Sequence, residues 1–302
     1  MVAVSGPEIV RVCVRHLMAR MAILLCLVPP FASSAADAGE VLTNARRVTG
    51  EERQEADLFV LGNTVFILYH ELGHALIDLL GLPVLGREED AADNLASVMM
   101  IPDEADPVMD ELIVAAADGW FLGNLRQHEA GNTEPSWWGE HSLDMQRFYS
   151  VVCLMYGSDP TGFAALAESV SLPAERRATC PNEYVQARAS WTRLLAPHMV
   201  PVEQRASQPS RVTVTFGPPP PGYDHVASLL RESGLIEAIA HDIGGGFKLP
   251  RDLAIHFEAC GAGDANAFYR NGPDHEGPNV VTVCYELVGF YNDLIMRDIA
   301  RR

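Results

Sequence analysis

The sequence predicts an α+β protein that is mostly helical and carries a small β-sheet. Residues 64–80 form an almost wholly apolar segment, and later segments up to residue 195 repeat apolar side chains every three or four positions. Short runs typical of strands occur only in the C-terminal third, at 212–216, 253–258, 266–270 and 280–285. The 302 residues, 48% of them hydrophobic, suffice for one large domain or two modest ones.

Acidic residues dominate the charge of the chain. There are 40 Asp and Glu against 22 Lys and Arg, which gives a formal net charge of -18, and Lys248 is the only lysine. Such a chain repels the phosphates of nucleic acids and anionic membrane surfaces. We therefore expect no nucleic-acid partner.

Residues 1–36 have the pattern of a secretory signal peptide. Three arginines precede an apolar stretch at 21–31, and small residues at 33–36 form a cleavage zone. A retained membrane anchor is the alternative, but Pro29 and Pro30 end the apolar run well short of the roughly 20 residues needed to span a bilayer. We expect a secreted or periplasmic protein with no stable membrane insertion after cleavage.

Four cysteines remain after this segment is removed: Cys153, Cys180, Cys260 and Cys284. In an oxidising compartment, two local disulfides, Cys153 with Cys180 and Cys260 with Cys284, are the simplest of three possible pairings. A four-cysteine zinc site is the rival interpretation, but the chain has no C-x-x-C spacing.

The apolar segment contains the motif His70-Glu71-Leu72-Gly73-His74. We expect its helix to begin at Asn63-Thr64 and to end before Gly81. On a helix, His70 and His74 lie at i and i+4 on one face, at the spacing that holds one metal ion. Glu71 would then lie beside that ion, as a general base for a water molecule. The alternative is a pair of hydrogen-bonded core histidines.

A second helix, predicted at 87–100, supplies candidates for a third ligand. Glu89, Ala92, Asp93 and Ala96 fall on one stripe of that helix. The order Glu89-Asp90-Ala91-Ala92-Asp93 resembles the E-x-x-A-D motif of the glutamate-type zincin peptidases. The resemblance implies that Glu89 is the third ligand of Zn²⁺ and that Asp93 orients His70 from behind. Glu88 is the neighbouring alternative to Glu89.

The longer stretch from His70 to Asp93 resembles a bacterial family of metallopeptidases, domain-of-unknown-function family 4344. The likeness continues to about residue 195 and includes Glu140-His141-Ser142-Leu143-Asp144. A zincin also needs a donor that stabilises the oxyanion. His141 is our first candidate and Tyr149 the second, with a purely structural histidine as the alternative.

The chain divides into a helical zinc metallopeptidase domain at 37–200, a proline-rich linker with a short strand at 201–223, and an α+β region at 224–302. We expect one helix at 224–243, closed by three glycines at 244–246. Asn266-Ala267-Phe268-Tyr269 resembles the edge strand that thermolysin-like peptidases lay against their substrate. In those enzymes the strand precedes the zinc helix, whereas here it follows.

Two interpretations of that order stay open. In the first, the chain is a circular permutant whose C-terminal region completes the active-site cleft. In the second, residues 224–302 are an accessory domain without a catalytic role. The resemblance implies a zincin-like fold and a zinc-dependent peptidase acting on peptides or proteins. A non-catalytic zinc-fold protein used for binding or inhibition is the alternative function.

Overall fold

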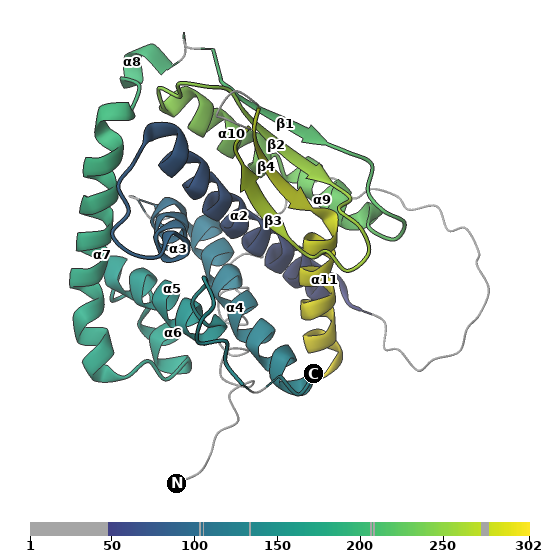
Figure 1. Cartoon of the computed structure of the whole chain (residues 1–302). Helices are drawn as coiled ribbons and strands as arrows, with labels where there is room; N and C mark the ends of the chain where they lie inside the picture. Colours follow the sequence, from purple (N-terminus) through teal and green to yellow (C-terminus); the bar gives the residue numbers. More distant parts are fainter. Residues whose placement is uncertain are drawn as a thin grey trace.

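A long central helix, α2 (Gly50–Leu80), organises the molecule (Figure 1). The computed structural model describes residues 48–302 apart from 103, 105, 133, 206, 208 and 273–277. The predicted signal peptide lies outside the described residues. Because an α-helix rises 1.5 Å per residue, the 31 residues of α2 extend about 46 Å.

The helix α2 begins earlier than predicted. Thr49 caps it, since its side chain accepts from the Glu52 amide and the Glu52 carboxylate accepts from the Thr49 amide. The prediction of a start at Asn63-Thr64 is wrong. Thr64 donates its hydroxyl to the Val60 carbonyl, and Asn63 bonds to carbonyls of α2 and of the neighbouring helix, so both side chains are satisfied inside a helix.

The residues after α2 form a helical layer. Its members are α3 (Glu88–Met100), α4 (Pro107–Glu129), α5 (Asp144–Ser158), α6 (Ala164–Ser169) and α7 (Ala174–Leu195), followed by the short η1 (Ala196–His198) and α8 (Val202–Arg205). Figure 1 shows α3, α5, α6 and α7 together on one side of α2. The Cys153–Cys180 disulfide joins α5 to α7, which confirms the predicted pairing.

The C-terminal third contributes a four-stranded sheet. Its strands are β1 (Val212–Phe216), β2 (Leu253–Glu258), β3 (Ala267–Arg270) and β4 (Asn279–Cys284), in the order β1-β2-β4-β3. β1, β2 and β4 run parallel, and β3 is an antiparallel edge strand on β4. The Cys260–Cys284 disulfide confirms the second predicted pairing. The predicted α+β class, mostly helical with a small sheet, is confirmed.

Three helices complete this region: α9 (Asp224–Ser233), α10 (Leu235–Gly246) and α11 (Tyr285–Ala300). The prediction of one helix at 224–243 is wrong, because Gly234 takes a left-handed conformation (φ 66°) and separates α9 from α10. The three glycines are the last three residues of α10, which ends at Gly246. A Cβ on Gly244 would lie 2.1 Å from the Ser210 hydroxyl, so this helix needs glycine to pack beside β1.

One continuous hydrophobic core joins the two parts of the chain. Phe66, Leu72 and Leu76 of α2 belong to the same buried cluster as Val281 of β4 and Ile295 of α11. None of the helices in the described part of the chain combines the length and the apolar character needed to cross a membrane.

Candidate metal centre and active site

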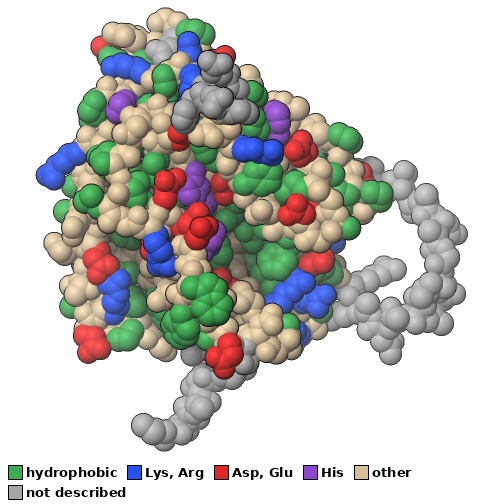
Figure 2. Space-filling view, in the orientation of Figure 1, with side chains coloured by type: hydrophobic (Ala, Val, Ile, Leu, Met, Phe, Trp, Pro, Cys, Tyr) green, Lys and Arg blue, Asp and Glu red, His purple; other side chains and the backbone are tan. Residues whose placement is uncertain are grey.

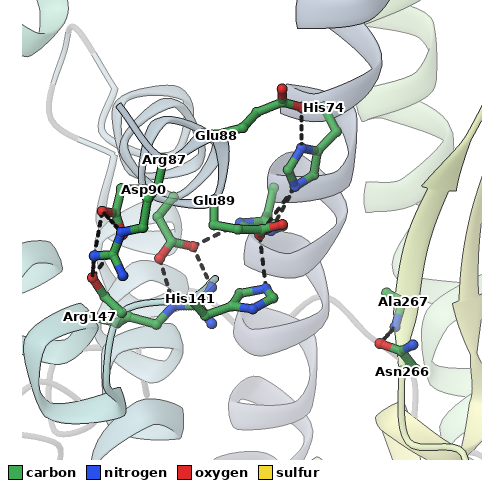
Figure 3. Close-up of polar contacts among 12 residues, drawn as sticks. His74, Arg87, Glu88, Glu89, Asp90, His141, Arg147, Asn266 and Ala267 are labelled. Atoms are coloured by element: carbon green, nitrogen blue, oxygen red, sulfur yellow. Dashed lines mark hydrogen bonds and ion pairs between the residues drawn. The ribbon is translucent and has the colours of Figure 1, made fainter. Parts of the chain in front are cut away.

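Three predicted side chains converge between α2 and α3 (Figure 3). The Nε2 atoms of His70 and His74 lie 3.2 Å apart. Oε2 of Glu89 lies 3.1 Å from Nε2 of His70 and 3.4 Å from Nε2 of His74. These three atoms face a common point, which is the arrangement that the spacing on the two helices predicts.

The separations fit the size of a zinc site. Zinc binds imidazole nitrogen and carboxylate oxygen at about 2.0–2.2 Å in tetrahedral geometry, which places neighbouring ligand atoms roughly 3.3–3.6 Å apart. The observed separations of 3.1, 3.2 and 3.4 Å are close to that range. The donor set of two imidazoles and one carboxylate therefore suits Zn²⁺, although zinc ligation itself stays a prediction.

A close helix contact brings Glu89 to the two histidines. A Cβ on Gly73 would lie 3.3 Å from the Cα atom of Ala92, and Ala92 is fully buried. Larger residues at either position would push α3 away from α2. The small residues of both motifs therefore set the distance between the helices, and that distance places the Glu89 carboxylate.

A chain of polar contacts orients His70. Its Nδ1 atom lies 2.8 Å from Oδ1 of Asp93, which itself binds the guanidinium of Arg147. Arg147 in turn stacks on Trp120, with Cζ 3.5 Å from the ring centroid. Burial works against the charged carboxylate of Asp93, but His70 and Arg147 outweigh it and lower its pKa. Asp93 therefore stays ionised and favours the tautomer that leaves Nε2 of His70 free for a metal.

Glu88 plays the corresponding part for His74. Its Oε1 atom lies 2.8 Å from Nδ1 of His74, on the side of the ring away from Glu89 (Figure 3). Burial lowers the pKa of His74, but Glu89 and Glu88 outweigh it and raise the pKa to about 9. The same negative field attracts a metal cation. The sequence reasoning weighed Glu88 only as a rival ligand and missed this orienting contact.

Glu71 is the residue predicted to act as the general base. It is buried, with 6% of its surface exposed, and it lines the same cavity as His70 and His141. Burial is the largest influence on its carboxyl group and raises the pKa, whereas the two motif histidines lower it. The Glu71 carboxyl group is thus outside the set of three ligand atoms but interacts electrostatically with both motif histidines.

His141, the first candidate for the oxyanion donor, lies beside the convergent atoms. Its Nε2 atom lies 2.8 Å from Oε2 of Glu89, and its ring stacks parallel to that of His70. The next residue, Ser142, donates to Asp90 and accepts from Arg87, which anchors the loop to the start of α3. The hydroxyl of Tyr149 donates instead to the carbonyl of Val170, and Tyr149 does not line the cavity.

The cavity beside these residues has a volume of about 570 Å³. Figure 2 shows histidine and acidic side chains together near the middle of one face, beside a hollow with hydrophobic side chains. Asn266 and Ala267 line the cavity, whereas Phe268 and Tyr269 of the predicted substrate strand do not. The hydroxyl of Tyr269 instead bonds to Asp78 of α2. Both parts of the chain thus contribute to the cavity wall.

Comparison with protein families identifies one family for this chain. The family model described as "Putative metallopeptidase" (domain-of-unknown-function family 4344) matches residues 34–195 and 219–300. The chain belongs to this family. No curated protein and no solved structure matches the chain.

Proposed function

We propose that the protein is a zinc-dependent peptidase in which His70, His74 and Glu89 hold the metal. The observation that carries the proposal is the convergence of their three ligand atoms within 3.4 Å of one another, beside a buried Glu71 in the same cavity. Membership of a metallopeptidase family supports it. The two disulfides favour an exported protein, secreted or periplasmic.

A zinc ion bound here would polarise the scissile carbonyl and lower the pKa of an adjacent water. With such an ion in place, Glu71 would take a proton from the attacking water as the new C–O bond forms, and would pass that proton to the amide nitrogen as the C–N bond breaks. His141 donates a hydrogen bond to the carbonyl oxygen as it becomes negative. His70 keeps its orientation through Asp93 and Arg147 during these steps.

The substrate backbone lies along β3 in this proposal. β3 pairs with β4 on one edge only, and the residues at its start, Asn266 and Ala267, line the cavity. An extended peptide can add to such an edge through main-chain hydrogen bonds. This mode would read the shape of the substrate more than its sequence.

A specific contact favours a second candidate, a zinc protein without catalysis. Because Nε2 of His141 lies 2.8 Å from Oε2 of Glu89, His141 could act as a fourth protein ligand. Four protein ligands close a zinc site, and such closed sites are structural. The side chain of His141 is 53% exposed on a loop, which instead favours a residue that can approach a substrate.

A chelator-controlled digest tests the proposal. The purified secreted chain is incubated with a mixed peptide library, with and without a zinc chelator, and zinc is then added back. We expect cleavage that the chelator blocks and zinc restores. Cleavage that persists in the presence of the chelator would contradict a metal-dependent peptidase. Absence of cleavage under all three conditions would contradict peptidase activity altogether.

The variant His141→Ala separates the two candidates. As a donor to the substrate, His141 should be dispensable for zinc content but needed for rapid cleavage. As a fourth ligand, its loss should lower zinc affinity. His128→Ala, at the exposed end of α4, is the matched control.

A further inference from the structure

One face of α4 forms a wall of the cavity beyond the metal centre. Gly119, Trp120, Gly123, Arg126 and Gln127 line it, at the spacing of one helical face. Trp120 lies next to the centre through its contact with Arg147. Six residues further along the helix, or about 9 Å at 1.5 Å per residue, the same wall reaches Arg126. The cavity wall therefore runs from Trp120, beside the metal centre, to Arg126 about two turns further along α4.

The guanidinium of Arg126 has a buried donor, Nη1, with no polar partner in the part of the chain that the structure describes. Its Nη1 atom is buried and has no hydrogen bond, and within the described ranges no carboxylate forms an ion pair with it. The group is held by a ring instead, because Cζ lies 4.7 Å from the centroid of Phe290. Stacking on a ring leaves the in-plane N–H donors of a guanidinium free. A buried donor without a partner costs free energy, which a bound acceptor would recover.

The other charged side chains in this part of the cavity already form ion pairs or hydrogen bonds within the protein. Arg147, the second arginine in the lining, binds Asp93. Asp144, the carboxylate on this side, accepts a hydrogen bond of 2.8 Å from Gln127. Among the described residues that line the cavity, Arg126 is thus the arginine without an ion pair.

The surrounding wall suits a short apolar stem that ends in an anion. Ile67, Leu287 and Phe290 provide apolar surface in the same cavity. The indole Nε1 of Trp120 is a second buried donor without a hydrogen bond. Apolar walls with a few convergent polar groups are typical of sites that select a ligand.

We propose that Arg126 binds a carboxylate of the substrate at the far end of a specificity subsite. The substrates would then be peptides with an acidic group near the scissile bond. This inference rests on the proposed peptidase function. The carboxylate has two sources, the side chain of a Glu or Asp residue and the C-terminus of the peptide. Arg126 binds either one as a specificity-determining residue, with no part in bond breaking.

Matched peptides test the subsite and distinguish the sources. The first pair differs only by Glu or Gln near the cleaved bond and has an amidated C-terminus. The second pair lacks acidic side chains and has a free or an amidated C-terminus. Wild type, Arg126→Met and Arg126→Lys are compared by kcat/KM, and Arg193→Met, at an exposed position on α7, controls for the loss of one positive charge.

We expect wild type to prefer the carboxylate member of one pair by about tenfold to a hundredfold, the usual value of a hydrogen bond to a charged group. Arg126→Met should abolish the preference and retain turnover of the neutral peptide, and Arg126→Lys should keep part of it. Arg193→Met should resemble wild type. Equal rates within both pairs for wild type, or an unchanged preference in Arg126→Met, would overturn the proposal.

Binding separates failure of this subsite from failure of the peptidase. The same fluorescently labelled peptides are titrated against Glu71→Gln and against Glu71→Gln combined with Arg126→Met. Tighter binding of the carboxylate peptide, lost in the double variant, would support the subsite even without any cleavage. Cleavage without discrimination would contradict the subsite alone. Absence of both cleavage and discrimination would contradict both proposals.

Discussion

The hydroxyl of Tyr269 donates a hydrogen bond of 2.7 Å to Oδ2 of Asp78, although the two residues are 191 positions apart in the chain. Burial raises the pKa of Tyr269, and the Asp78 carboxylate raises it further, so the phenol stays a donor at neutral pH. Asp78 lies one helical turn beyond His74 on α2. This bond ties the edge strand β3 to the helix that carries the metal-binding motif.

Tyr269→Phe should therefore weaken both the fold and the cleft. We expect a loss of about 1.5–3 kcal/mol in the free energy of unfolding, measured in urea, because the hydrogen bond to the charged Asp78 carboxylate disappears. Peptide cleavage should also fall, because β3 is less firmly placed. Tyr149→Phe removes a hydrogen bond to the backbone carbonyl of Val170, outside the cavity, and should destabilise the fold by a smaller amount without slowing cleavage. Equal cleavage by the two variants at matched stability would argue against a role for β3.

The ends of the described chain lie close together, as circular permutation requires. The Arg302 guanidinium binds Glu55, in the second turn of α2, with 2.6 Å between Nη1 and Oε1. Joining residue 302 to residue 48 by a short Gly/Ser linker and opening the chain between 205 and 212 should preserve metal content and cleavage. Loss of folding in this variant would mean that the present order of segments is required.

The fragment 37–205 gives the complementary test. Without α11 and the sheet, the core around α2 loses part of its cover, and the cavity loses Asn266 and Ala267. We expect the fragment to unfold at lower temperature and to cleave little. A stable fragment with full activity would end the permutation hypothesis and favour an accessory domain.

Asp93→Asn tests the orienting role of the second motif. An amide keeps the shape but loses the charge that faces His70 and Arg147. Loss of such an outer contact typically lowers metal affinity by about 10- to 100-fold. Competition with a zinc chelator measures this affinity. Asp90→Asn, three residues earlier on α3, contacts Arg87 and Ser142 but no motif histidine, and should change it little.

Asp118 on α4 should make stability depend on pH. Burial raises its pKa from 3.8 to about 8, with further contributions from Asp298 and Glu55. Between about pH 4 and 8 the folded state holds a proton that the unfolded state has lost, so stability falls as pH rises through this window. Asp118→Asn should flatten the dependence and raise the melting temperature more at pH 8.5 than at pH 5. An equal shift at both values would contradict the raised pKa.

Local spacing made part of the site predictable. His70 and His74 share α2, and Glu89 follows within 20 residues at the start of the next helix, so two consecutive helices suffice to bring them together. The contacts of Arg147 with Asp93 and of Arg126 with Phe290 depend on how distant helices pack, and no motif marks them. The predicted start of α2 at Asn63 is wrong for the same reason: the side chain of Asn63 bonds to Ala115 on α4, a contact that the sequence does not reveal.

Glu71→Gln is the most direct test of the proposed mechanism. The amide keeps the size of the side chain but cannot take a proton from water, so cleavage should fall by about 10²- to 10⁴-fold. Zinc content, measured by atomic emission, and melting temperature should stay close to those of wild type. Cleavage at the wild-type rate by a fully zinc-loaded Glu71→Gln protein would contradict the role of Glu71 as the general base.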